Sequence, residues 1–297
     1  MKKTILTAVA LFILSISQIN AQSASFANGP ADAAALSMGG MQYDTPARAL
    51  FGTEKLYVGA TYMMWQPSML NASRINADFR MKVSDKFAFT GRYRMNMMQK
   101  MDVTNEAGAI VSSFSPKDNM LELGLGFGFG NFALSAAGKL ITSNLQADAG
   151  ATAFGFDAAA TYRIGNLLAA AHIRNIGQKL TYNGASYPLP TRVGISVSDK
   201  FALAEKHSLE VAADIDYQLT ANYNAVIAAI GAGYCYNNLI NLRLGYHLGS
   251  DATIEPSYAS LGCGVKIQGI TIDAAYLIAG VDSPLKNTLA LTLGYAF

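Results

Sequence analysis

From Lys55 to the C-terminus, segments of roughly ten residues recur in which apolar and polar side chains alternate. In residues 74–83, "RINADFRMKV", every odd-numbered residue is apolar and every even-numbered residue is polar or charged. Residues 87–97, 209–217 and 240–248 follow the same rule closely, and turn-forming pairs such as "NG", "GN" and "NN" separate the segments. A two-residue period is that of a β-strand with one apolar face. The chain is therefore expected to be all-β.

Both a soluble β-sandwich and a transmembrane β-barrel alternate in this way, so the composition has to decide between them. Only 14% of the residues are charged, and Gly, Ala and Ser are common on the polar face, as in a filled interior. Tyr and Trp stand near many strand ends, where an interfacial girdle needs them. After the N-terminus no apolar run reaches the roughly 18 residues of a membrane helix. In a bilayer this leaves a closed barrel.

The alternating segments predict an antiparallel transmembrane barrel of fourteen strands. An even number suits a single-chain barrel whose two ends lie on the periplasmic side, although merging one pair would give twelve strands. The predicted strands are 55–65, 72–83, 86–100, 119–130, 131–143, 151–163, 166–176, 190–200, 207–219, 223–236, 238–249, 257–268, 269–280 and 287–297.

The first 54 residues do not alternate and are expected to have other roles. Residues 1–21 carry Lys2 and Lys3, then an apolar run and Ala21 before the expected cleavage point, which is the pattern of a secretory signal peptide. Residues 22–54 are rich in Gly and Ala, with a short helix expected over 31–37. This segment is long enough to fold back into the lumen as a plug, so residues 55–297 form the barrel.

The last strand, "TLALTLGYAF" (288–297), ends on an aromatic residue. Tyr295 and Phe297 resemble the C-terminal signal that the barrel-assembly machinery reads in the outer membrane. The strand has to close against the first one, since an unpaired edge in lipid is very costly. The expected location is therefore the cell outer membrane, with its lipid and the assembly machinery as partners.

Several segments also resemble known families. "ADAAALSMGGMQYDTPARALF" (31–51) is similar to the start of FadL-like outer-membrane proteins: Gly39, Gly40, Pro46 and Ala47 match, while Thr45 replaces the usual Asn. "LYVGATYMMWQPSMLNASRINADFRMKV" (56–83), "IRNIGQKLTYNGASYPLPTRVGIS" (173–196) and "YCYNNLINLRLGYHLG" (234–249) resemble the PorV/PorQ branch of Bacteroidota. The resemblance implies a FadL-like barrel, a plug that includes the four matching residues, and secreted cargo and type IX secretion components as partners.

Charged residues on the polar faces are expected to line the lumen. They are Arg74, Asp78, Arg80, Arg92, Arg94, Glu210, Asp214, Asp216, Arg243 and His247, with Lys82 near the end of its strand. Buried charges need partners, so ion pairs could simply fill the interior. In a wider lumen the same residues would select solutes. Charge alone does not separate these two readings.

No pattern in the sequence predicts an enzyme, a cofactor or a metal site. "GLGFGFG" (124–130) lacks the spacing of a nucleotide-binding loop, and its glycines are expected to make room for the plug or for a bend. Cys235 is expected on the inner face and Cys263 on the outer face of non-neighbouring strands, so a disulfide is not expected. The inward His172 and His247 show no Ser or Asp partner. A net charge of +2 also argues against nucleic acid.

The sequence leaves three functions open. The first is a non-enzymatic role in type IX secretion or in cargo handling at the cell surface, as the PorV/PorQ resemblance implies. The second is a FadL-like channel for small hydrophobic molecules, with a greasy pocket under the extracellular rim and a mobile plug. The third is a purely structural barrel. For the channel, methionines could line one end, although packing at the lipid or girdle is the simpler reading: Met63, Met64, Met95, Met97 and Met98.

Overall fold

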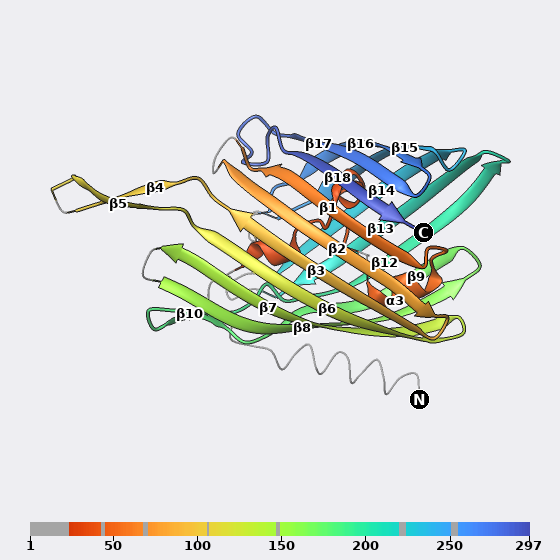
Figure 1. Cartoon of the computed structure of the whole chain (residues 1–297), viewed down its shortest axis with the longest axis horizontal. Coiled ribbons are helices and arrows are strands. Elements are labelled where there is room, and N and C mark those ends of the chain that lie inside the picture. Colours follow the sequence, from red (N-terminus) through yellow and green to blue (C-terminus); the bar gives the residue numbers. More distant parts are fainter. Residues whose placement is uncertain are drawn as a thin grey trace.

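The computed structural model describes residues 24–42, 45–67, 71–105, 107–146, 149–219, 224–250 and 255–297. The predicted signal peptide lies outside these residues. Fourteen strands form one closed antiparallel barrel, in the order β1-β18-β17-β16-β15-β14-β13-β12-β9-β8-β7-β6-β3-β2 (Figure 1). The predicted fold class and strand number are confirmed, and the alternative of twelve strands is wrong.

The barrel strands agree with the predicted segments to within a few residues. They are β1 (Leu56–Trp65), β2 (Ala72–Ser84), β3 (Phe87–Met97), β6 (Lys117–Phe129), β7 (Phe132–Gln146), β8 (Ala149–Ile164), β9 (Leu167–Gly177), β12 (Arg192–Ala204), β13 (His207–Gln218), β14 (Ala225–Tyr236), β15 (Ile240–Leu248), β16 (Tyr258–Ile267), β17 (Ile270–Ala279) and β18 (Leu289–Ala296). Two hairpins outside the wall were not predicted. They are β4 (Met101–Thr104) with β5 (Ile110–Phe114), and β10 (Leu180–Tyr182) with β11 (Ala185–Tyr187).

The two ends of the barrel differ in the length of their connections. At one end, which we call the turn end, short turns such as Asp85-Lys86 and Gln268-Gly269 join the strands. Strand β1 begins and the C-terminal strand β18 ends at this end. The opposite end, here the loop end, carries the longer connections and both extra hairpins. The β4–β5 hairpin projects well beyond the wall (Figure 1). Outer-membrane barrels place short turns in the periplasm and long loops outside the cell.

The wall alternates between an apolar outer face and a buried inner face. In β18 the outward Leu291, Leu293 and Tyr295 are 45–60% exposed, whereas Ala290 and Thr292 are buried. Tyr295 and the terminal Phe297 lie on the outside, with ring centroids 5.9 Å apart. No described helix is long and apolar enough to cross a membrane. Leu, Ile, Val and aromatic side chains therefore cover the outer surface of the strands, as lipid requires.

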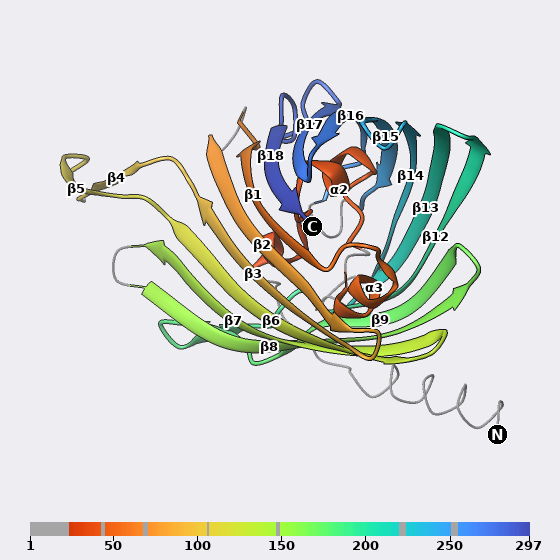
Figure 2. The same ribbon diagram turned by 45° about the vertical axis from the view of Figure 1, so that its right-hand side comes forward.

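The residues before β1 lie inside the barrel, and we call residues 24–42 and 45–54 the lumenal segment. It contains the 3-10 helix η1 (Ser25–Asn28) and the helices α2 (Ala33–Ser37) and α3 (Pro46–Phe51). The ring of strands surrounds α2 and α3 (Figure 2). The Asp32 carboxylate accepts a hydrogen bond from the Ala35 amide and caps α2. Thr45 caps α3 in the same way, with Pro46 at its first position.

Glycines in the wall make room for both helices. A Cβ on Gly245 of β15 would lie 2.1 Å from the Gly39 nitrogen, and one on Gly262 of β16 would lie 2.3 Å from the Ser37 Cβ. On the opposite wall, a Cβ on Gly126 of β6 would lie 2.7 Å from the Pro46 oxygen. The predicted role of "GLGFGFG" as space for an N-terminal segment is confirmed at this contact. Side chains at these positions would collide with atoms of the lumenal segment, so the glycines set where the helices can dock.

Candidate functional site in the barrel lumen

The structure places all ten predicted lumenal residues on the inner side of the wall. They are Arg74, Asp78, Arg80, Arg92, Arg94, Glu210, Asp214, Asp216, Arg243 and His247. Gly39, Gly40, Pro46 and Ala47 lie in the lumenal segment, where Gly39 and Gly40 both have positive φ angles, of 81° and 72°. That left-handed conformation favours glycine and lets the chain turn sharply after α2.

A chain of ion pairs crosses the inner wall from β2 to β8. The Arg92 guanidinium donates to Asp78 at 2.5 Å and lies 3.6 Å from Glu122. The Lys139 ammonium lies 3.4 Å from Glu122 and 2.7 Å from Asp157. All five side chains are buried or half-buried, and each charge has an opposite neighbour on an adjacent strand. This arrangement keeps the lumen polar without leaving these charges unpaired.

A second network joins β9, β12 and β13. His172 Nε2 lies 2.7 Å from an Asp216 oxygen, and the Arg174 guanidinium lies 3.6 Å from the same carboxylate. Arg192 bonds to Glu255, which comes from the loop before β16. The expectation that His172 lacks an acidic partner was therefore wrong. The pairing depends on the register of three strands, which places His172 and Asp216 on either side of Gly194.

Arg192 and His247 favour the ionised form of Glu255. Burial alone would raise the pKa of this carboxyl, but Arg192 and His247 outweigh it and hold the pKa below its ordinary value. The His247 Nε2 lies 3.8 Å from a Glu255 oxygen, and its ring stacks on Tyr258 with centroids 4.8 Å apart. Glu255 is therefore a fixed anion at the loop end.

The His172, Asp214 and Asp216 side chains approach the spacing of a metal site, since their ligand atoms lie within 4.8 Å of one another. Arg174 reaches to within 4.0 Å of both carboxylates, so a cation already balances the charge that a metal would need. Among the described residues no hydroxyl or thiol hydrogen-bonds to His172. The cluster is arranged as an ion-pair network and does not resemble a hydrolase triad.

The remaining predicted charges pair locally or with the lumenal segment. Arg48 of α3 reaches Glu210 of β13 at 2.8 Å, and Arg243 of β15 reaches Asp273 of β17 at 2.7 Å. Arg80 stacks on the Tyr57 ring at 4.1 Å. The acids of β13 thus find partners on α3 and β9, whereas Arg92 of β3 pairs with Asp78 of β2.

Buried polar side chains of the wall hold the lumenal segment by its backbone. The Arg94 guanidinium donates to the carbonyl oxygens of Phe26 at 2.6 Å, Ala27 at 3.2 Å and Pro30 at 3.3 Å. The Asn76 amide donates to the Ala31 oxygen at 2.5 Å. Carbonyls of an irregular segment need such donors when they are buried. Arg94 and Asn76 together fix the turn that leads into α2.

Two short parts of the stretch 173–196, "NIG" (175–177) and "LPTR" (189–192), meet at the loop end of the seam between β9 and β12. Asn175 has a positive φ of 55° at a bulge opposite Asp157. Its side-chain nitrogen Nδ2 donates to the Asn28 side-chain oxygen at 2.6 Å. The same nitrogen bonds to the Pro190 oxygen, while the Thr191 hydroxyl donates back to the Asn175 carbonyl at 2.8 Å. This seam therefore also anchors η1.

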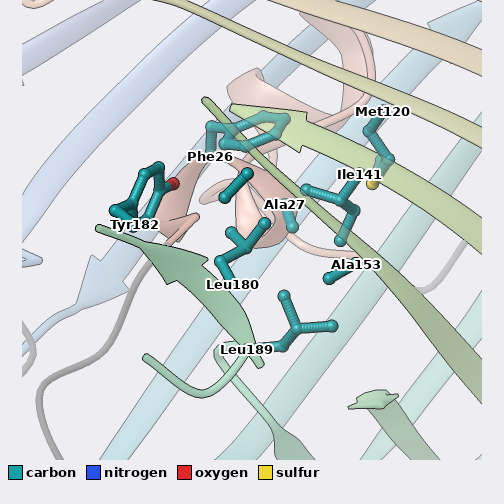
Figure 3. Packing of buried hydrophobic residues seen from close by; sticks show 9 residues of the cluster. Phe26, Ala27, Met120, Ile141, Ala153, Leu180, Tyr182 and Leu189 are labelled. Atoms are coloured by element: carbon teal, nitrogen blue, oxygen red, sulfur yellow. The ribbon is translucent and has the colours of Figure 1, made fainter. Parts of the chain in front are cut away.

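An apolar cluster lies inside the loop end, and Phe26 is buried in it (Figure 3). Its walls come from β6, β7, β8, β10 and the segment before β12: Met120, Ile141, Ala151, Ala153, Leu180, Tyr182 and Leu189. Burial raises the pKa of the Tyr182 hydroxyl. We call this cluster the Phe26 chamber. Three further apolar clusters among the described residues pack α2, the turn after it and α3 against the wall. The Phe26 chamber differs from them in burying a phenylalanine ring.

A cavity of about 390 Å³ lies in the lumen and extends from Ala27 of η1 to Glu54 and Cys235 near the turn end. Charged and polar side chains from the wall and from the lumenal segment line it, including Arg48, Arg80, Lys139, Glu210 and Arg243. Residues of the lumenal segment, such as Ala27 and Met38, also line this cavity. Charged groups occur at the loop end as well, where Arg192 pairs with Glu255.

The cysteines and methionines divide between the two faces of the wall. Cys235 lines the 390 Å³ cavity, Cys263 is exposed on the outer face, and both are free thiols. Met63 is fully buried against α2 residues, whereas its neighbour Met64 is 42% exposed outside. Met95 and Met97 share the outward face of β3 with Tyr93, and Met98 is half-buried beyond that strand. Of these methionines, Met63 alone contacts the lumenal segment.

The fold has clear counterparts among solved structures. The Pseudomonas putida toluene transporter TodX matches with a TM-score of 0.62 at 12% identity, covering 91% of this chain and 99% of that one. The Ralstonia pickettii toluene transporter TbuX matches with a TM-score of 0.61 at 13% identity, covering 92% and 99%. The fold is FadL-like. The Acinetobacter baumannii protein Omp33 also matches, with a TM-score of 0.52 at 9% identity over 82% and 98% of the chains. No protein-family model and no curated protein matches the sequence.

Proposed function

We propose that this protein is a non-enzymatic outer-membrane channel that admits small hydrophobic molecules from outside the cell. The observation that carries the proposal is the Phe26 chamber. Inward positions of a barrel are expected to be polar, yet here three adjacent strands and a loop bury the aromatic ring of Phe26 among apolar side chains. A concave apolar site with few polar groups is the usual form of a hydrophobic ligand site.

Phe26 occupies the place that a ligand would take. Burying a side chain of this kind contributes about 1.5–3 kcal/mol, and a small aromatic molecule would gain a similar amount at the same site. A ligand that displaced Phe26 would also disturb η1, because Arg94 holds the Phe26 and Ala27 carbonyls. Binding in the chamber and release of the lumenal segment would therefore be linked.

The fold neighbours support the same proposal. TodX and TbuX are described as toluene transporters, and CymD as a monoaromatic hydrocarbon channel. These likenesses concern the fold, and the chamber is what connects them to this chain. We propose in addition that residues 1–21 are a cleaved signal peptide, that residues 22–54 act as the plug, and that Tyr295 and Phe297 direct assembly.

Accumulation of radiolabelled toluene tests the channel in a bacterial strain that lacks its own hydrocarbon channels. Wild type should raise the initial rate above the empty vector, and Ile141→Gln should reduce it by placing an amide in the chamber. Ser135→Gln is the matched control, since Ser135 lies on the same strand but lines the polar cavity. Equal rates for wild type and vector, at equal surface levels of protein, would refute the proposal.

A second candidate is a role in type IX secretion, as in the PorV/PorQ family that the sequence resembles. The β4–β5 hairpin favours it, because it projects from the loop end and exposes Met101, Val103, Ile110 and Val111. Secretion subunits or cargo would be the partners. Replacing residues 101–114 with a Gly/Ser linker should then abolish co-purification of secretion subunits and reduce surface display of cargo. Unchanged co-purification and display would exclude the hairpin from this role.

A further inference from the structure

A second, smaller pocket of about 90 Å³ lies at the loop end, between η1, the end of β1 and the loop that carries Glu255. Gly29, Trp65, Arg74, Arg192 and Tyr258 are among the residues that line it. A single water needs about 10–15 Å³ of such space, so the pocket can hold a group of several heavy atoms. It is separate from the Phe26 chamber, with which it shares none of its lining residues.

Arg74 is the unusual residue of this pocket. It is only 2% exposed, and its Nε and Nη1 atoms have no hydrogen-bond partner among the described residues. The guanidinium carbon lies 4.2 Å over the Trp65 ring, and Nη1 lies 1.9 Å from the place where a Gly29 Cβ would stand. Leaving a buried donor unpaired costs about 1–3 kcal/mol, and more when the group is charged. By contrast, Arg94 on the neighbouring strand β3 donates hydrogen bonds to three carbonyl oxygens.

The acids around the pocket are already committed to other partners. Glu255 bonds to Arg192 and lies near His247. Asp118 of β6 accepts hydrogen bonds from the Ser143 hydroxyl and the Asn96 amide. Of the charged groups that line the pocket, Arg192 pairs with Glu255 and also lies 3.8 Å from Asp216. The unused donors of the pocket are therefore those of Arg74.

We propose that this pocket binds a small oxyanion, a carboxylate or a phosphate group, which accepts hydrogen bonds from the guanidinium of Arg74 under the ring of Trp65. Arginine suits such groups because its planar fork of donors matches two oxygens at once. Gly29 has no side chain that would displace the guanidinium, since a Cβ there would lie 1.9 Å from Nη1. This site goes beyond the proposed hydrophobic channel and does not depend on it.

Trp65 gives a direct test, because it is the only tryptophan of the chain. Purified protein in detergent is titrated with sodium phosphate, acetate or chloride at constant ionic strength, and Trp65 emission is recorded. Phosphate or acetate should change the emission saturably, while chloride should not. In a second series, micelles doped with a short-chain anionic phospholipid replace the free anions. A response there alone identifies a lipid head group as the source, and a response to free anions identifies a soluble one.

Three variants decide whether Arg74 is responsible. Arg74→Gln and Gly29→Ala should each raise the half-saturating concentration at least tenfold. Arg80→Gln is the matched control, because Arg80 also points inward and stacks on an aromatic ring, but toward the 390 Å³ cavity. Heat-dependent mobility on gels verifies folding, and Arg74→Lys replaces Arg74→Gln if the latter does not fold. No saturable response in wild type, or an equal response in the Arg74 and Arg80 variants, would overturn the proposal. Failure here would leave toluene uptake unaffected, so the two proposals fail separately.

Discussion

Arg94 gives the sharpest prediction about how the lumenal segment is held. The change Arg94→Leu introduces an apolar side chain of moderate size and removes the donors to the Phe26, Ala27 and Pro30 carbonyls. Each buried carbonyl left without a donor costs about 1–3 kcal/mol. Because Phe26 and Ala27 share one nitrogen and the turn can relax, we take about 3 kcal/mol for the whole change, at the low end of that sum.

At about 1.4 kcal/mol for each factor of ten, this loss weakens docking of the segment more than a hundredfold. The barrel ladder does not depend on Arg94, so its hydrogen bonds should be unaffected. Hydrogen exchange followed by mass spectrometry can separate the two effects. Peptides covering residues 24–36 should lose protection by about a hundredfold, whereas peptides from β7 should exchange as in wild type.

Arg243→Gln is the matched control for this experiment. Arg243 is also an inward arginine, but it pairs with Asp273 of the wall. Its replacement should leave the exchange of residues 24–36 unchanged. If Arg94→Leu exchanges at the wild-type rate in this region, the buried bonds do not hold the segment and the reasoning is wrong.

Two further predictions concern the loop end and the glycines. Gly245→Ala should destabilise docking of α2 by about 1–3 kcal/mol, because its Cβ would meet backbone atoms, while Gly233→Ala has only ordinary contacts and should be neutral in the same exchange experiment. The pKa of Glu255 is lowered in the folded protein, so its contribution to stability is complete above the ordinary glutamate range and is lost as the pH falls through the lowered value. Acid should therefore loosen the Arg192–Glu255 contact and shift Trp65 emission, and Glu255→Gln should lack that transition; identical acid titrations would contradict the assignment.

The wall was predictable from the sequence because its two-residue period is local. Within each strand, the alternation of apolar and polar residues indicates which face meets lipid, as in residues 74–83. Turn residues indicate where each strand ends. The β4–β5 and β10–β11 hairpins escaped prediction because their short strands lie in loops and alternate weakly. The helix α3 was not predicted either, because it has only six residues, beginning at Pro46, and so shows little helical periodicity.

The lumen was only partly predictable, because its contacts depend on register and on the path of a segment far away in the sequence. Alternation places Arg94 and His172 inside but does not name their partners. His172 meets Asp216 because two strand pairings align them, and Arg94 meets carbonyls about 65 residues earlier in the chain. The Phe26 chamber was missed for the same reason, since its walls come from three strands and a hairpin.

The most direct test of the account uses its two native cysteines as reporters on opposite faces of the wall. Single-cysteine variants, Cys263→Ser and Cys235→Ser, are spin-labelled in lipid bilayers, and collisions with oxygen and with a polar nickel chelate are measured. The label at Cys263 should collide with oxygen and be shielded from nickel, whereas the label at Cys235, which lines the polar cavity, should show the reverse. Comparable nickel access at both positions would contradict a closed barrel with an apolar exterior and a polar lumen.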